Sequence, residues 1–350
     1  MRKYLLPENG NFYKANLHCH STVSDGVLTP EELKKAYMDK GYSIIAYTDH
    51  DIMIDHSDLT DENFLALRSY EMQINEKRTD EEKKIRPPKT CHICMIALDL
   101  SVENQVCWNS QKRLHGNLEK YRDQVKYDKS LPDYKNEYTP ECINDMIRLC
   151  REGGFFVTYN HPAWSMEYAE DYLKYEGMNA MEICNFSSYA IGWDDYVPYI
   201  YDEILRSGKR IYCIAADDNH NDTGDNWAYD SFGGFTVIKA DKLEYRTVTK
   251  AMEDGNMYAS QGPEIYDLYV EDGKVYIKCS PARRIVLSTG KRYSRCVWAN
   301  IGDHFGEGSE KTITEASFDI PEDCHYIRLT VIDMEGRPAN TRAYFLDEIN

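Results

Sequence analysis

NLHCHSTVSDG, residues 16–26, places two histidines directly after a short run, Phe12 to Leu17, that can form a β-strand. Side chains at positions i and i+2 of a strand point to the same face, so His18 and His20 are expected to converge on one spot. A single pair of this kind is weak evidence. The same arrangement recurs along the chain, and that repetition gives the pattern its meaning.

Ligand-type residues follow three further strand-like runs. Asp49-His50 follows residues 43–47, His161-Pro162 follows residues 155–159, and Asp218-Asn219-His220 follows residues 211–216. Six of the ten histidines lie in or beside such runs: His18, His20, His50, His92, His161 and His220. Imidazole is the commonest metal ligand near neutral pH. The pattern therefore predicts a metal site at the carboxyl end of a β/α barrel.

At these residues the chain resembles the PHP (polymerase and histidinol phosphatase) family of metal-dependent phosphoesterases. The matching stretches are NLHCHSTVSDG (16–26), YTDHD (47–51), ALRSYEMQI (66–74), CHICMIALD (91–99), YNHPA (159–163) and AADDNH (215–220). The resemblance implies an α/β fold, a distorted (β/α)7-type barrel, and two to three divalent metal ions. Ligands of nitrogen and oxygen without a thiolate suit Mn, Fe or Zn.

The resemblance also implies how nine candidate ligands are shared. One site would use His18, His20, Glu71 and Asp218; a second would use Glu71 as a bridge with His92 and His161; a third would use Asp25, His50 and His220. Adjacent residues of a strand face opposite ways, and Asp218 shares a face with His220. Asp218 is therefore the expected ligand, whereas Asp217 is expected to be a loop residue or a support whose substitution has a mild effect on turnover.

The predicted activity is hydrolysis of a small phosphorylated metabolite, a nucleotide or a sugar phosphate. A pair of ions about 3.5 to 4 Å apart can activate a bridging water as hydroxide and neutralise the phosphoryl group. Glu71 and Asp218 would hold these ions. Arg113 and His115, in the polar insertion 104–138, are candidates for phosphate contact or proton donation, or else parts of a solvated loop. His56, His304 and His325 are expected to be ordinary residues.

Three alternatives stay open. The chain could be a histidinol-phosphate phosphatase, a metal-dependent C–N hydrolase of the amidohydrolase type, or a non-catalytic protein that binds metal or carbohydrate. Ligands alone do not define the bond that is cleaved.

Composition limits the partners. The chain has 41 Lys and Arg against 59 Asp and Glu, a net charge of −18, which argues against an extended nucleic-acid groove. It shows no apolar stretch of about 20 residues and no signal-peptide pattern, so no membrane partner is expected. Eleven cysteines, many in apolar runs, fit free thiols in a cytoplasmic protein. A homo-oligomer is compatible with the sequence.

The chain divides by pattern near Gly262-Pro263. Strands and helices alternate over residues 1–262, which predicts a parallel sheet or barrel for the metal-dependent hydrolase domain. Residues 75–89 are highly charged and are expected to be an exposed hairpin or loop. Residues 263–350 contain short strand-like runs with no convincing helix, which predicts a small all-β sandwich. No candidate ligand lies beyond residue 262.

Overall fold

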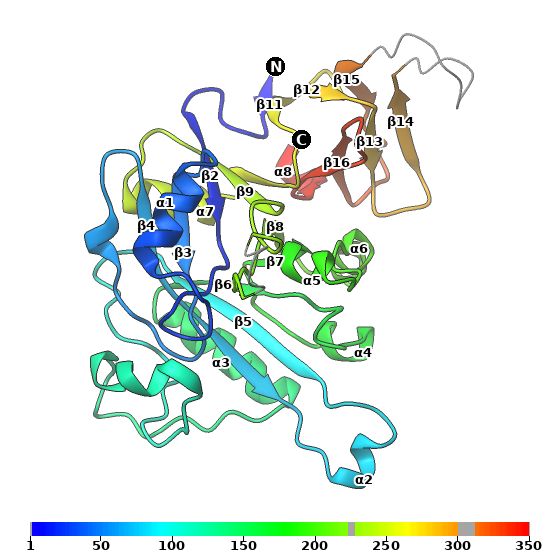
Figure 1. The fold of residues 1–350 in the computed structure, drawn as a ribbon. Coiled ribbons are helices and arrows are strands. Elements are labelled where there is room, and N and C mark those ends of the chain that lie inside the picture. Colours follow the sequence, from blue (N-terminus) through cyan, green and yellow to red (C-terminus); the bar gives the residue numbers. More distant parts are fainter. Residues whose placement is uncertain (1, 223–227, 300–311, 350) are drawn as a thin grey trace.

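The computed structural model describes residues 2–222, 228–299 and 312–349. It is a mixed α/β structure with one 14-stranded sheet and one sheet of four strands (Figure 1). His304, which was expected to be an ordinary residue, lies outside the described residues. No helix within the described ranges is long and apolar enough to cross a membrane.

The first 262 residues form ten strands and most of the helices. The strands are β1 (Lys3–Tyr4), β2 (Asn11–Asn16), β3 (Ile44–Tyr47), β4 (Leu65–Asn75), β5 (Thr90–Ala97), β6 (Phe155–Tyr159), β7 (Ala180–Asn185), β8 (Tyr212–Ala216), β9 (Phe235–Ala240) and β10 (Met257–Ser260). The helices are α1 (Pro30–Met38), η1 (Ser57–Leu59), α2 (Asp80–Lys83), η2 (Gly116–Gln124), α3 (Pro140–Glu152), α4 (Ala169–Tyr172), α5 (Phe186–Ala190), α6 (Pro198–Arg206) and α7 (Tyr245–Glu253).

The large sheet is mixed rather than parallel throughout. Neighbouring strands pair in parallel from β2 to β4 and again from β6 to β8, but β5 runs antiparallel between β4 and β6. The expectation of a parallel sheet is therefore wrong at β5 and also at β9 and β10, which pair in antiparallel with β2 and with each other. A parallel crossover needs a dozen or more residues, usually with a packed helix, whereas the charged segment after β4 forms only the short exposed helix α2 at the tip of a hairpin (Figure 1).

The sheet curls around an internal apolar cluster. Every strand from β2 to β9 contributes at least one side chain to this cluster, and α7 adds Val248 and Met252. The end strand β8 approaches β9, where Thr236 Oγ1 bonds both the amide and the carbonyl of Ala215. These hydrogen bonds involve a side chain, so they are not the backbone pairing that would join β8 directly to β9. A mixed, strongly curled sheet is thus established, and the closed seven-stranded barrel stays a prediction.

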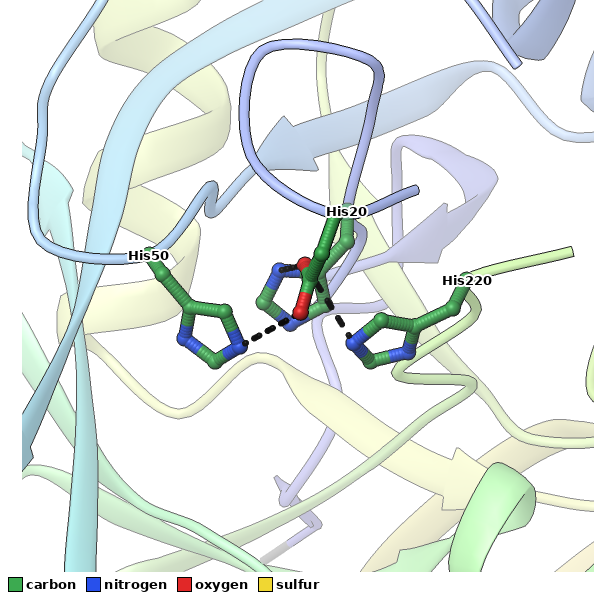
Figure 2. Close-up of side chains that lie close together, drawn as sticks. His20, His50 and His220 are labelled. Atoms are coloured by element: carbon green, nitrogen blue, oxygen red, sulfur yellow. Dashed lines mark ion pairs between the residues drawn. The ribbon is translucent and has the colours of Figure 1, made fainter. Parts of the chain in front are cut away.

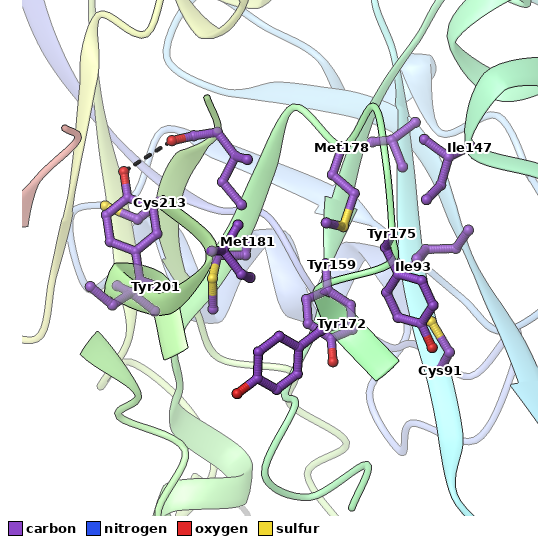
Figure 3. Close-up of a cluster of buried hydrophobic side chains, with 14 of the residues drawn as sticks. Cys91, Ile93, Ile147, Tyr159, Tyr172, Tyr175, Met178, Met181, Tyr201 and Cys213 are labelled. Atoms are coloured by element: carbon purple, nitrogen blue, oxygen red, sulfur yellow. Dashed lines mark hydrogen bonds between the residues drawn. The ribbon is translucent and has the colours of Figure 1, made fainter. Parts of the chain in front are cut away.

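A second apolar cluster lies on the outer side of β5 to β8, under α3 and α6. Figure 3 shows its tyrosines, methionines and cysteines packed side by side. Polar tips of these rings find partners: Tyr201 donates a hydrogen bond to the Ile211 carbonyl at 3.0 Å, which ties α6 to the start of β8. This packing fixes the strand ends that carry the candidate ligands.

The C-terminal part contains β11 (Ile265–Glu271), β12 (Lys274–Ala282), β13 (Arg284–Ser288), β14 (Ser294–Trp298), β15 (Ile313–Asp319), β16 (Tyr326–Ile332), β17 (Pro338–Thr341), β18 (Tyr344–Phe345) and the four-residue helix α8 (Leu346–Ile349). The small sheet β1–β11–β12–β15 shares an apolar cluster with β13 and β16 of the large sheet. The predicted all-β sandwich is thus present only in part, because two sheets pack on one apolar cluster but one of them is the large sheet itself. The short helix α8 and the recruitment of β1 from the N-terminus were not predicted, because neither leaves a local signal.

Contacts cross the predicted boundary at residue 262. Strand β17 extends the large sheet by pairing with β10. Arg328 Nη2, almost fully buried, lies 2.7 Å from Asp202 Oδ2 of α6, and the Ala343 amide donates to Tyr201 Oη at 3.0 Å. The C-terminal strands therefore cover the outer cluster, and the division into two domains stays a prediction.

We expect removal of residues 264–350 to abolish folding of the remaining chain. The truncation would expose the β10 edge and leave Asp202 and the outer cluster without their partners. Circular dichroism and size-exclusion chromatography of residues 1–263 would measure this. Shortening the exposed hairpin tip by deleting residues 80–85 is the control and should be tolerated. A soluble truncation that unfolds cooperatively would contradict the expectation.

Candidate metal centre

Nine side chains meet beyond the carboxyl ends of the parallel strands. The nine are the predicted ligands, and their donor atoms form four overlapping groups within which all atoms lie within 4.8 Å of one another. The groups are His20, Asp25, His50 and His220; His18, Glu71 and His161; His18, His20 and Asp218; and His50, Glu71 and His92. Strand β5 runs in the opposite direction, so His92 reaches the centre from near its amino end.

Glu71 lies at the middle of the cluster. Its Oε1 is 3.0 Å from His92 Nδ1, and its Oε2 is 2.8 Å from His50 Nδ1. Oε1 is also 3.2 Å from His18 Nε2 and 3.4 Å from His161 Nε2. A carboxylate whose two oxygens face different imidazoles is placed to join two metal sites, which is the role predicted for Glu71.

The grouping differs in detail from the one that the resemblance implied. His20 lies with Asp25, His50 and His220 as well as with His18 and Asp218. Figure 2 shows the rings of His20, His50 and His220 converging from three separate segments. His20 is thus placed between two groups, and His50 is shared between the Asp25 group and the Glu71 group.

The donor atoms fit a cation. Four buried atoms of the candidate ligands make no hydrogen bond among the described residues, although the first two of them lie 2.8 Å apart: His50 Nδ1, Glu71 Oε2, His92 Nε2 and Asp218 Oδ1. Each orphaned buried polar atom costs roughly 1–3 kcal/mol unless something satisfies it. Bound divalent ions would accept these lone pairs, and an all nitrogen and oxygen donor set suits transition metals.

His18 gives the sharpest test of this fit. Its Nδ1 lies 2.7 Å from Glu182 Oε1, so the ring donates there and its Nε2 carries a lone pair. That Nε2 faces Asp218 Oδ1 at 3.1 Å and Glu71 Oε1 at 3.2 Å. Acceptors facing acceptors at these distances require a positive charge between them, either a proton or a metal ion.

The pKa values reflect the same electrostatics. Burial favours the neutral form of Glu71, but the surrounding imidazoles, His92 first, hold its pKa well below the ordinary value. Burial also lowers the pKa of His50 and His161, yet carboxylates, chiefly Glu71, raise both to about 9. His20 has a pKa lowered to about 4 by burial and by the neighbouring imidazoles. The carboxylates therefore favour positive charge at the imidazoles that face them.

Glu182 on β7 supports two ligands and was not predicted. Besides His18, its carboxylate accepts hydrogen bonds from the His161 amide at 2.9 Å and from Asn185 Nδ2 at 2.9 Å. Asn185 in turn donates to Asp218 Oδ2 at 3.1 Å. The available signal was a single acidic residue inside the apolar run Met181–Cys184. Burying a carboxylate is costly unless it is paired or hydrogen-bonded, so its position indicates buried partners.

Asp49 organises the loop that carries Asp25. It accepts bonds from the amides of Ser21 and Ser24 at 2.9 and 3.0 Å, and from both of their hydroxyls. Gly26 closes this loop, where a Cβ would lie 2.5 Å from the His20 carbonyl oxygen. Asp25 itself is more than half exposed at the rim, with Oδ2 3.5 Å from His50 Nε2.

Adjacent Asp217 and Asp218 have different surroundings. Asp218 lies in the cluster, with Oδ1 2.9 Å from His20 Nε2. Asp217 faces away, is fully buried and accepts bonds from the amides of residues 232–234 and from Tyr37 Oη. Asp217 lies in the loop just after β8 and holds the turn at residues 232–234, so it is both of the things expected of it, a loop residue and a support.

Seven of the nine predicted ligands, all except His18 and His20, line a cavity of about 600 Å³. His115 lies in its wall, as does Trp164, whose ring is 5.4 Å from His92 and 5.0 Å from His161. Arg113 is exposed and is not among the described residues that line this cavity, so the structure does not place it with the ligands. The insertion packs Trp108 and Leu118 against Val23 and Ile52 beside the cavity, which makes it a wall of the site.

Comparisons with known proteins give limited matches. No protein-family model matches the chain. A segment of 38 residues is 53% identical to a 5'-3' exoribonuclease of Haemophilus influenzae, a match that covers 11% of this chain and 14% of that relative's length.

Among solved structures, a two-domain protein of Bacteroides vulgatus with a predicted PHP-like metal-dependent phosphoesterase is 14% identical, with 98% of both chains covered and a TM-score of 0.43. A Chromobacterium violaceum amidohydrolase is 15% identical (59% of this chain, 87% of that chain, TM-score 0.35). A Bifidobacterium adolescentis protein, predicted to be a metal-dependent phosphoesterase, is 14% identical (61% and 89%, TM-score 0.32). PHP-like proteins are thus among the structures to which this chain is similar.

Proposed function

We propose that this protein is a metal-dependent phosphoesterase that acts on a small phosphorylated metabolite, a nucleotide or a sugar phosphate. The observation that carries the proposal is the cluster of nine donors with orphaned buried lone pairs at the base of one cavity. Two to three divalent ions, Mn, Fe or Zn, would use all nine donors. A closed barrel around them and a trinuclear centre belong to the same proposal.

Bound ions would supply activation of water and neutralisation of charge on the phosphoryl group. Glu71, Asp218 and Asp25 together bring three negative charges, which is fewer than the positive charges of two or three divalent ions. The centre would therefore keep a positive balance within an acidic chain. Such a balance attracts an anionic substrate to the cavity.

The chain's own residues hold this centre and shape the cavity. Glu182 fixes the His18 ring so that its Nε2 faces inward, and Ser165 Oγ lies 3.1 Å from His161 Nδ1. His115, exposed in the cavity wall, is our candidate donor of a proton to the leaving group. Trp164 offers a flat apolar surface next to the ligands for the remainder of the substrate.

The cavity's size supports a small substrate. Its volume of about 600 Å³ falls within the usual range for small-molecule sites, roughly 300–1,000 Å³. The net charge of −18 disfavours an extended nucleic acid. We therefore propose a small phosphorylated partner in the cytoplasm, no membrane partner, and compatibility with a homo-oligomer.

Metal reconstitution tests the proposal. Protein stripped with a chelator and reloaded with Mn, Fe or Zn in turn should bind two to three ions per chain and regain hydrolysis of an aryl phosphate with at least one metal. Elemental analysis and release of p-nitrophenol would measure the two quantities. Chelation should remove both together, because the same donors serve both.

The other outcomes separate the alternatives. Fewer than one ion per chain in protein purified without chelator would refute the metal centre itself. A full metal complement that cleaves an aryl amide but no mono- or diester would favour C–N hydrolysis over the phosphoesterase. A full complement with no turnover of phosphate esters or amides would favour the non-catalytic alternative.

A further inference from the structure

A second cavity of about 600 Å³ lies away from the metal centre, between the large sheet and the segment that joins β10 to β11. Its floor is the outer face of three neighbouring strands, where Lys14 of β2 pairs with Val237 of β9 and Val237 pairs with Tyr258 of β10. In Figure 1 these strands lie next to the C-terminal sheets. We call this cavity the β10–β11 groove.

Two lysines give the β10–β11 groove a positive charge. Lys14 Nζ lies 4.0 Å from the ring centre of Tyr42 and 4.1 Å from that of Phe235, and Lys40 Nζ lies 5.6 Å from that of Phe232. Neither ammonium has an ion pair within the described part of the chain. Burial lowers the pKa of Lys14, and Lys40 lowers it further, whereas Asp217 and Glu264 raise it in part. A bound anion would offset the free-energy cost of keeping the partly buried Lys14 ammonium charged.

The other charged groups of the wall are engaged with neighbours. Arg337 Nε lies 2.7 Å from Asp333 Oδ2, and Glu264 Oε2 accepts a hydrogen bond from Tyr266 Oη at 2.8 Å. Glu264 keeps its negative charge in this hydrogen bond, and the two lysines are the cations of the wall that have no ion pair among the described residues. Two other aromatic side chains of the wall are accessible: Phe12 is 39% exposed and Tyr266 is 47% exposed, and Phe12 packs edge-on to the buried Tyr258.

We propose that the β10–β11 groove binds a small aromatic anion, with its acidic group against Lys14 and Lys40 and its ring against the exposed rings of Phe12 and Tyr266. An acidic group on an aromatic ring matches both features of the wall, since ammonium groups bind anions and exposed rings pack on planar apolar surface. The wall also includes Phe232, whose amide donates to Asp217. The site lies outside the proposed catalytic cavity, so its test reads binding and is independent of hydrolysis.

Paired fluorescent probes test the proposal on the full chain. 8-Anilinonaphthalene-1-sulfonate carries one sulfonate, and N-phenyl-1-naphthylamine has the same rings without it. We expect saturable binding of one sulfonate probe per chain and clearly weaker binding of the amine. Lys14→Met should weaken the sulfonate by about tenfold or more, the usual effect of losing a bond to a charged group, and should leave the amine unchanged.

Controls keep the result decisive. Lys40→Met changes an exposed side chain, so it tests the same charge without risk to folding. Lys34→Met is the matched control, because Lys34 also lies over a ring, Phe64, but outside this groove. Three results would overturn the proposal: unchanged sulfonate affinity in both Lys14→Met and Lys40→Met, an equal loss of affinity in Lys34→Met, or equal affinity of the wild type for the two probes. The groove would then be a packing defect without a ligand.

Discussion

Glu71→Gln is expected to remove most bound metal and to lower turnover of an aryl phosphate more than about 100-fold, the upper range seen when only a supporting residue is lost. The carboxylate is the one acid shared by two of the four donor groups, and imidazoles from four other segments face its oxygens. Glutamine keeps the shape but removes the charge and offers one oxygen. Both adjacent sites should therefore weaken together.

Folding should suffer much less than metal binding in this variant. Ions that bind only the folded state raise its stability, so the wild type should gain thermal stability on reloading with Mn or Zn and Glu71→Gln should gain little. Asp51→Asn is the matched control: it removes one carboxylate from the same cavity, but Asp51 pairs with Lys112 and belongs to none of the donor groups. If both variants keep the same metal content, Glu71 is not a ligand.

Most candidate ligands were predictable from the sequence because they follow or lie within an apolar run, whereas Asp25 lies in a polar loop and was placed by the family resemblance alone. His18, His50 and His161 sit where a buried strand ends, and that placement alone brings them to one edge of the sheet. The backbone there is unusual: His161 and Asp218 adopt positive φ angles of 28° and 54°. Such strain is typical of functional sites and leaves no signal in residue order.

Long-range relationships were not predictable. The direction of β5 depends on whether a helix can pack between it and β4, and the sequence shows only a charged segment there. β1 joins a sheet whose other strands lie more than 250 residues later. Glu182 was missed because its partners, His18 and His161, come from distant segments. A single acidic residue in a strand does not indicate which residues it will contact.

Asp217→Asn is expected to lower stability and Asp218→Asn to lower metal binding, although the two residues are neighbours. The Asp217 carboxylate accepts bonds at 2.8–3.0 Å from the amides of residues 232–234 and from Tyr37. An asparagine would turn one oxygen into a donor that faces donors. Leaving two buried donors unpaired costs roughly 2 kcal/mol or more, so Asp217→Asn should lower the free energy of unfolding by about that amount.

Asp218→Asn should instead leave folding nearly unchanged and lose metal. Its Oδ1 makes no hydrogen bond, and the oxygen of an asparagine can still accept from Asn185 Nδ2, which donates to Oδ2 at 3.1 Å in the wild type. Urea unfolding of chelated protein measures the first effect and elemental analysis of reloaded protein the second. Asp217→Asn should keep most of its metal, because its side chain does not face the donors. If Asp217→Asn loses the ions while Asp218→Asn keeps them, the assignment of the two aspartates is reversed, and the face argument that separates them is wrong.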